Sequence, residues 1–150
     1  MAVKPIPDGY DAAIPYLSCI DASGALDFYG RAFGAVEMMR VMQTDGRLGH
    51  AEFRIGNAKL MLADEFPEMG VRSPKSLGGT PVGIHVYVED VDALAARAVA
   101  AGATLVRPVA DQFYGDRSAV LDDPYGHRWY FATHVEDLTD EEIQRRNSGG

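Results

Sequence analysis

The sequence predicts an α+β domain of two tandem βαβββ modules, which form a curved, cupped mixed sheet with helices on its convex face. Three observations predict this fold. The order strand, Asp, short helix, Gly-Ala and three strands occurs twice, and Asp21 and Asp90 begin the two helices. The copies are offset by roughly seventy residues, which is typical of a duplicated unit. The strand segments alternate apolar and polar residues, as half-buried strands do. Two curved half-sheets can enclose one cavity, so the repeat predicts a small-molecule site between the modules.

The first module is expected over residues about 12–64. Its helix begins after Asp21, which suits an N-cap position, has an apolar face at i, i+3, i+7 spacing, and ends at Gly34 in a left-handed C-cap. The pairs Asp45-Gly46 and Gly56-Asn57 predict hairpin turns, so the strands around them run antiparallel. The four expected strands are 14–20, 36–43, 48–55 and 58–64.

The second module is expected over residues about 82–134. Its helix has an Ala-rich body at 93–99, which has a strong helix propensity, and ends near Gly102. The Asp-Pro-Tyr-Gly segment at 123–126 has the residues that a type I turn favours. The four expected strands are 82–88, 104–107, 117–122 and 127–133.

Two further segments complete the chain. A linker rich in Pro and Gly, residues 65–81, joins the modules and is long enough to lie across the mouth of the cavity. Thr139 and Glu142 form a capping box for a short polar helix at about 139–146. We therefore interpret residues 1–150 as a single domain.

Composition narrows the function classes. Of 150 residues, 47% are hydrophobic and 24% charged, which is ordinary for a globular domain with a substantial core. The net charge of −8 argues against nucleic acid and anionic membranes as partners. We expect no membrane span or signal peptide, and a buried, inert thiol at the single cysteine, Cys19. A cytoplasmic protein is the expectation.

Strand alternation sorts the polar residues onto one face of each half-sheet. In the strand 82–88, Ile84, Val86 and Val88 form an apolar face, and His85 lies on the opposite one. If the polar faces converge, they form the wall of the cavity. His85 is then the candidate catalytic residue. The candidate substrate-binding residues are Tyr16, His50, Glu52, Tyr87, Tyr114, Arg128 and Tyr130.

The alternative is that these residues simply lie on the solvent-exposed side of their strands, because antiparallel sheets commonly expose one face to water. His127 and His134, which flank the last strand, are expected at the surface. The carboxylate pairs Glu65 and Glu68, Asp122 and Asp123, and Glu141 and Glu142 are interpreted as solvated charge. The sequence contains no Gly-x-Ser-x-Gly, P-loop or His-Glu-x-x-His motif.

The duplicated unit, the helix segment Ala25-Leu26-Asp27-Phe28-Tyr29 and the segment 123–129 together resemble the vicinal oxygen chelate superfamily. That superfamily includes glyoxalase I, extradiol dioxygenases and the fosfomycin- and bleomycin-resistance proteins. The segments 86–92, 107–108, 113–117 and 132–137 look most like its PhnB-like branch. The resemblance covers roughly residues 12–146 and leaves the reaction type open, because one fold hosts many chemistries.

The resemblance also implies where a divalent metal would bind, through one His or Glu from each of four strands. These positions fall on Ile14, on or beside Met61, on Gly83 and on Tyr130. None of these side chains suits a hard divalent cation. We therefore expect no metal and no cofactor. A rearranged site built from His50, Glu52 and His85 is the alternative.

Two function hypotheses follow. In the first, a homodimer binds a small organic molecule in aromatic grooves without catalysis, as the resemblance to bleomycin-resistance proteins implies, and the acidic chain favours a cationic ligand. In the second, an atypical lyase, isomerase or transferase uses His85 as acid or base. Glu52 or Tyr87 would orient His85, and Arg117 or Arg128 would hold an anionic group. A third possibility is a relative whose own side chains fill the cavity.

Overall fold

Each module forms its own four-stranded mixed sheet in the computed structural model, which describes residues 2–149. In both sheets the first strand of the module pairs in parallel with the fourth, and the third and second strands follow in antiparallel order. The predicted tandem βαβββ fold is therefore confirmed. Module one contains β1 (Tyr16–Cys19), α1 (Ala22–Phe33), β2 (Val36–Met42), β3 (Leu48–Ile55) and β4 (Ala58–Asp64). Module two contains β5 (Gly83–Tyr87), α3 (Val91–Ala101), β6 (Thr104–Asp111), β7 (Asp116–Asp122) and β8 (Arg128–His134).

Both main helices begin and end as the sequence predicts. The side chain of Asp21 accepts a hydrogen bond from the Gly24 N–H, and that of Asp90 accepts one from the Ala93 N–H. Gly34 ends α1 with a φ of 69°, in the left-handed region that favours glycine. The repeated Asp at the start of each helix is therefore a structural N-cap in both modules.

Strand β6 extends beyond the predicted segment 104–107 and reaches Asp111. The extension passes through Pro108, which has no N–H to donate to a ladder. However, β6 is the edge strand of its sheet, where proline is tolerated, and its pairing with β7 is irregular between Arg107 and Ala110. Strand β1 is shorter than predicted and begins directly after Pro15.

One apolar core extends through both modules. In α1, the ring of Tyr29 contacts Phe53 of its own module and Trp129 of β8. The ring of Phe33 stacks on Tyr29 and contacts Trp129 and Phe131 of β8. Helix α1 also packs against α3. The helix-facing sides of both sheets therefore contribute to the same core.

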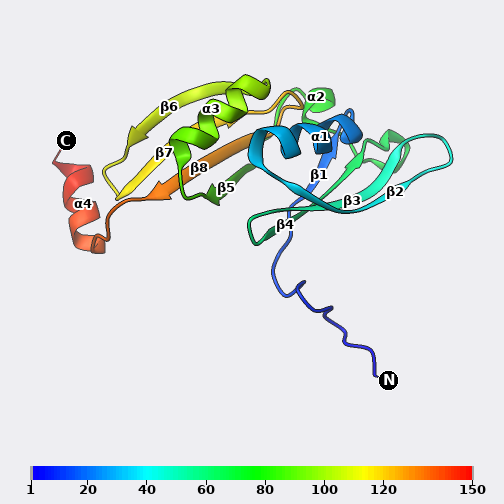
Figure 1. Ribbon diagram of the computed structural model, residues 1–150, viewed down its shortest axis with the longest axis horizontal. Coiled ribbons are helices and arrows are strands. Elements are labelled where there is room, and N and C mark those ends of the chain that lie inside the picture. The colour runs from blue at the N-terminus through cyan, green and yellow to red at the C-terminus, as the bar shows by residue number, and fades with distance from the viewer. Residues whose placement is uncertain (1, 150) are drawn as a thin grey trace.

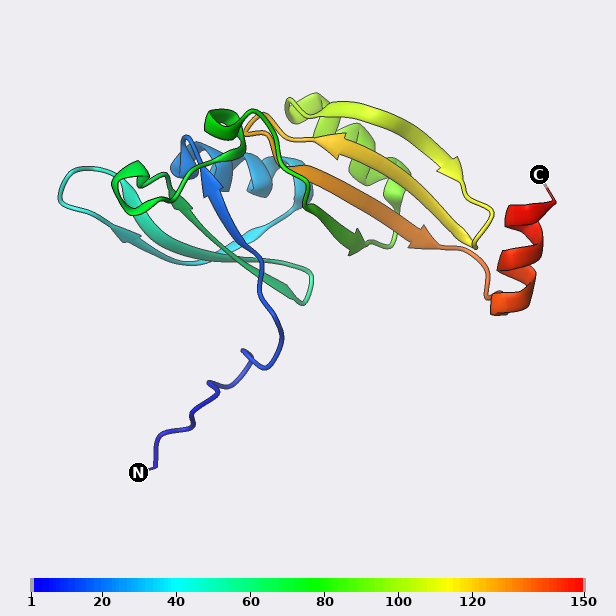
Figure 2. The same ribbon diagram turned by 180° about the vertical axis from the view of Figure 1, so that it is seen from behind.

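The two modules lie side by side along the long axis of the molecule (Figure 1). The first residues of the segment before β1 project away from the modules, and α4 (Asp140–Ser148) lies at the far end of module two (Figures 1 and 2). The linker contains a 3-10 turn, η1 (Pro67–Met69), and a short helix, α2 (Pro74–Leu77), which contacts β1. Within residues 2–149, every helix is too short or too polar to cross a membrane.

Candidate functional site

The faces turned away from the helices carry the predicted polar residues. In β3, Ala51, Phe53 and Ile55 are buried against the helix side, whereas Glu52 and His50 lie on the opposite face. In β5, Val86 is buried and His85 is exposed. Period-two alternation therefore correctly assigned these side chains to opposite faces of their strands.

Three of the predicted residues meet on module one. His50 Nε2 lies 2.7 Å from Glu52 Oε2, and His50 Nδ1 lies 2.7 Å from the hydroxyl of Tyr16. Strand β4 lies between β1 and β3, so the Tyr16 side chain extends over β4 to reach the His50 imidazole on β3. The result is a hydrogen-bonded chain that runs from a carboxylate, through an imidazole, to a phenol that is half exposed.

The protonation states of this chain follow from its partners. Hydrogen bonds from Tyr10 and His50 lower the pKa of Glu52, so its carboxylate is ionised near neutral pH and can only accept. A neutral His50 therefore carries its proton on Nε2 and accepts the Tyr16 hydroxyl at Nδ1. Burial and the charge of Glu52 raise the pKa of Tyr16, which keeps that phenol protonated. The ionised carboxylate of Glu52 therefore orients the His50 ring, so that Nδ1 faces the Tyr16 hydroxyl.

Tyr10 completes this group and was not predicted. Its hydroxyl donates to Glu52 Oε1, and its ring lies 3.8 Å from the Lys59 ammonium, which also donates to the Gly9 carbonyl. The segment before β1 is rich in Pro and Gly and has no secondary structure. No sequence pattern indicated that its single tyrosine reaches the polar face of module one.

A second polar group lies on module two. The rings of His85 and Tyr87 are 4.9 Å apart, and the Tyr87 hydroxyl donates to Asp116 Oδ2 at 2.7 Å. Asp116 is only 3% exposed and accepts a further hydrogen bond from His134 Nδ1 at 2.8 Å. Burial by itself would raise the pKa of Asp116, but the hydrogen bonds from His134 and Tyr87 lower it overall.

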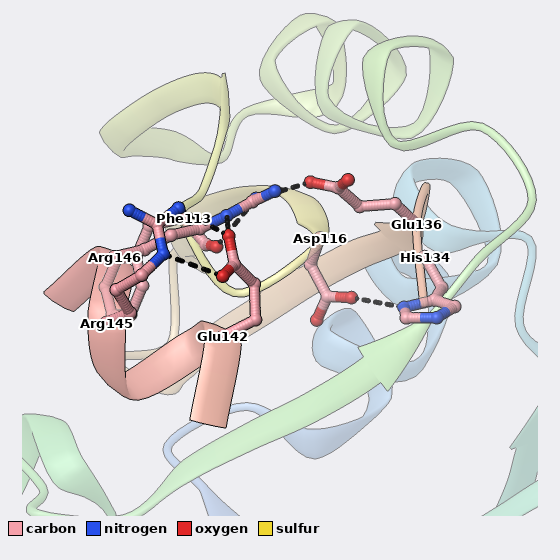
Figure 3. Close-up of polar contacts among 7 residues, drawn as sticks. All are labelled: Phe113, Asp116, His134, Glu136, Glu142, Arg145 and Arg146. Carbon is pink, nitrogen blue, oxygen red and sulfur yellow. Dashed lines mark hydrogen bonds and ion pairs between the residues drawn. The ribbon is translucent and has the colours of Figure 1, made fainter. Parts of the chain in front are cut away.

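His134 lies at the surface as expected, but both of its ring nitrogens face carboxylates. Its Nδ1 contacts Asp116, the residue opposite it on β7, and its Nε2 lies 2.7 Å from Asp137 Oδ1. Figure 3 shows the Asp116 contact. Both hydrogen bonds form only when both nitrogens carry protons, so Asp116, followed by Asp137, raises the pKa of His134. Extending the alternation of β7 and β8 to their ends would have found this pair.

The remaining predicted residues also lie on module two. Tyr114, in the β6–β7 turn, packs edge-on against Phe113. Arg128 is already bound by Asp122, with hydrogen bonds of 2.8 and 3.0 Å that raise the pKa of the guanidinium. An anionic ligand at Arg128 would have to compete with Asp122.

The predicted residues thus form two groups rather than one. Tyr16, His50 and Glu52 belong to module one, whereas His85, Tyr87, Tyr114, Arg128 and Tyr130 belong to module two. Within residues 2–149, no hydrogen bond or ring contact links the first group to the second.

Two cavities lie where the modules meet, and His85 lines both. One of about 290 Å³ is bounded by residues 11–15, 57–60 and 84–86. The other, of about 610 Å³, is bounded by Phe33, 55–58 and 85–89 and therefore includes Tyr87. Volumes of this size suit small organic ligands. Tyr16 lines a separate cavity of about 290 Å³ between β1 and the linker.

The four positions at which the resemblance places metal ligands do not fit a metal. A Cβ atom at Gly83 would lie 2.2 Å from Tyr130 Cε2, so the Tyr130 ring occupies the space that a ligand at position 83 needs. Ile14 and Met61 offer an aliphatic group and a thioether. Within residues 2–149, no three His, Cys, Asp or Glu side chains are grouped as a metal would require. These residues do not fit the metal of the superfamily enzymes.

Two sequence interpretations are wrong. Asp123 is not solvated charge but is buried in the shared core, where it accepts four hydrogen bonds. His127 is not at the surface but is buried, with Nε2 2.9 Å from the Ser18 carbonyl oxygen. Cys19 is fully buried, as predicted, and burial raises the pKa of its thiol. Trp129 is fully buried as well.

Comparison with known proteins agrees with this geometry. An uncharacterized protein of Mycobacterium tuberculosis is 49% identical over 136 residues, which cover 89% of this chain and 80% of that protein. The crystal structure of TioX from Micromonospora sp. ML1 has a TM-score of 0.64 and 27% identity, covering 86% of this chain and all of TioX. A PhnB protein from Bacillus cereus has the same fold, with a TM-score of 0.62 and 17% identity over 82% of this chain and 99% of that chain. The profile of the glyoxalase/bleomycin resistance protein/dioxygenase superfamily matches residues 15–131, and with its two βαβββ modules the chain belongs to that superfamily.

Proposed function

We propose that this chain binds a small organic molecule between its two modules, as a PhnB-like member of the superfamily. The observation that carries this proposal is the cavity of about 610 Å³ at the module junction, lined by His85 and Tyr87. It combines an apolar wall, which includes Phe33, with an imidazole and a phenol that can orient a ligand. That the protein is located in the cytoplasm stays a prediction from the sequence.

We propose further that binding occurs without the usual divalent metal. The support is steric as well as chemical, because the Tyr130 ring lies over Gly83 where a ligand side chain would stand. Metal analysis of the purified protein tests this point. Stoichiometric Zn, Ni, Mn or Fe that is lost in His50→Ala or His85→Ala would contradict it and would favour the rearranged site.

A homodimer is the proposed assembly. Strand β2 is the edge of its sheet, and each of its seven residues is exposed. The large apolar residues exposed on this strand are Val36, Met38, Met39, Val41 and Met42. A long apolar edge strand favours association, and a second copy of this chain would cover it. Sedimentation of the wild-type protein and of Val41→Glu tests the assembly, and a monomeric wild-type protein would contradict it.

Acid–base catalysis by an atypical lyase, isomerase or transferase is the second candidate. The observation that favours it is the pair of His85 and Tyr87, whose ring centroids lie 4.9 Å apart at the module junction. In this case His85 remains the proposed acid or base at the module junction, where its ring lines both cavities.

Native mass spectrometry of the freshly purified protein tests the binding proposal. We expect a bound organic molecule that is retained in native spectra and lost on denaturation. His85→Ala distinguishes the two candidates, because it changes affinity alone if the protein only binds, and removes turnover if His85 is catalytic. Gln144→Ala on α4 is the control, since it lies outside both junction cavities. Absence of any retained or added small molecule at the junction would contradict the proposal.

A further inference from the structure

Tyr10 and Glu52 form a contact that the proposed function does not use. We propose that Glu52 is the recognition carboxylate for a ligand that carries an ammonium group, and that Tyr10 is a displaceable donor that occupies this carboxylate until the ligand binds. This inference rests on the proposed function, because it names the chemical class of the ligand and adds a subsite on module one.

The first argument is that no Lys or Arg of residues 2–149 makes a direct ion pair with Glu52. This carboxylate is only 7% exposed, and buried carboxylates are normally paired with a charged group. Within residues 2–149, however, no Lys or Arg lies within ion-pair distance of Glu52, and its only ion-pair partner is His50. Oε1 is bound by the neutral Tyr10 hydroxyl. Lys59 favours the charged form of Glu52 without contacting it, because its ammonium is engaged by the Tyr10 ring and the Gly9 carbonyl. An ammonium group on a ligand would instead place a positive charge in direct contact with Oε1.

The second argument is the surroundings of this carboxylate. Met39 and Met61 are the cross-strand partners of Glu52 on either side, so thioethers flank it. The ring of Tyr10 already accepts a cation, since the Lys59 ammonium lies 3.8 Å from its centroid. A carboxylate set among aromatic rings and thioethers is suited to an amine on an apolar body, and it disfavours an anion.

The third argument is that Tyr10 can leave at little cost. Residues 2–9 are exposed, and the first residues of this segment project away from both modules (Figures 1 and 2). The region around Tyr10 is attached through its hydroxyl at Glu52 and through the hydrogen bond from Lys59 to the Gly9 carbonyl. Segments with so few buried contacts open with small free energies. A ligand N–H can therefore replace the Tyr10 O–H at Oε1.

NMR titration of the full-length protein tests the inference. The probes are benzylammonium chloride, sodium benzoate and benzyl alcohol, which share one apolar body and differ in charge. We expect benzylammonium alone to shift the backbone amides around Glu52. Tyr10→Phe removes the competing hydroxyl and keeps the ring, so it should bind benzylammonium up to about tenfold more tightly, as expected from the loss of one hydrogen bond to a charged group. Glu52→Gln should lose this binding, and Glu37→Gln on the neighbouring strand β2 is the control.

The inference is overturned if Tyr10→Phe binds benzylammonium no more tightly than the wild-type protein, or if benzoate binds at Glu52 as well as benzylammonium does. If Glu52→Gln does not fold, Tyr10→Phe alone tests the inference. Tyr10 lies outside every strand and helix, so its substitution should leave the fold intact. Failure here is distinct from failure of the proposed function. Probes that shift His85 and Tyr87 without preference for positive charge would overturn the ammonium inference and leave small-molecule binding intact.

Discussion

The hydroxyl of Tyr29 in α1 donates a 2.6 Å hydrogen bond to Oδ2 of Asp123, which lies in the β7–β8 turn of the other module. The indole N–H of Trp129 donates to the same oxygen at 2.9 Å, and the backbone N–H groups of Tyr125 and His127 donate to Oδ1. Four donors thus replace the hydration of a buried carboxylate and connect the two modules through their shared core.

Asp123→Ala is expected to destabilise the protein strongly. The change leaves the Tyr29 hydroxyl and the Trp129 indole without their acceptor inside the core, so we expect a loss of about 3–5 kcal/mol in the free energy of unfolding. Urea denaturation measures the loss. Asp27→Asn, on the exposed side of α1, is the matched control and should stay within about 0.5 kcal/mol of the wild-type protein. A similar small change in Asp123→Ala would show that the carboxylate does not hold the modules together.

The fold could be predicted because its determinants are local and occur twice. Asp21 and Asp90 are N-caps that need only the three residues after them, and the faces of β3 and β5 follow from alternation along one strand. The turn at Asp123 was also recognisable, since its carboxylate binds the N–H groups of Tyr125 and His127 within the same turn.

The rest depends on contacts between distant segments. The second carboxylate oxygen of Asp123 binds Tyr29 from a helix 94 residues earlier, and no local pattern specifies that partner. Tyr10 reaches Glu52 from a segment without secondary structure, across 42 residues. Alternation assigned His50, Glu52 and His85 to the correct faces, but it does not describe how two sheets are placed, so it could not reveal that these residues form two groups.

Gly83→Ala is expected to displace the Tyr130 ring. An added Cβ would lie 2.2 Å from Cε2 of that ring, so either the ring moves or the strand shifts. Overpacking of this kind costs about 1–3 kcal/mol of unfolding free energy. In the Tyr130→Ala background the same glycine change should cost much less, because the ring is absent, and a double-mutant cycle measured in urea gives the coupling. Equal costs in both backgrounds would mean that the ring does not fill the space above Gly83.

The contacts of His134 predict a pH-dependent contribution to stability. Asp116 and Asp137 raise its pKa above the ordinary 6.5, so the stabilisation is fully present below about pH 6.5 and is lost as pH rises through the raised value. The pKa of Asp116 is lowered, so the stabilisation that its carboxylate contributes is lost only when pH falls through that lowered value. His134→Gln should therefore reduce the urea midpoint more at about pH 5.5 than at about pH 9.

Asp137→Asn serves as the comparison for this pH effect. It removes the exposed partner of His134 and keeps the buried contact with Asp116, so it should give a smaller change of the same sign. A His134→Gln effect that is equal at both pH values would contradict the ionic role of the imidazole.

Arg146 is expected to control the attachment of α4. It donates to Glu136 and to the Phe113 carbonyl, which lie outside the helix, and to Glu142 within it (Figure 3). Helix α4 has no buried residue, so these polar contacts hold it against the β6–β7 turn and the segment that follows β8. Arg146→Gln should increase amide hydrogen exchange across residues 140–148 and leave the urea midpoint of the whole domain unchanged.

Arg145→Gln is the matched control for Arg146, because Arg145 is its neighbour on the same helix and, among residues 2–149, its side chain pairs with Glu142 alone. It should change exchange in α4 much less than Arg146→Gln does, since the contacts with Glu136 and Phe113 remain. Added salt should reproduce the Arg146 effect in the wild-type protein, because exposed ion pairs are screened. Equal exchange in the two variants would mean that α4 is held by helix-internal pairs and not by its contacts with the β6–β7 turn.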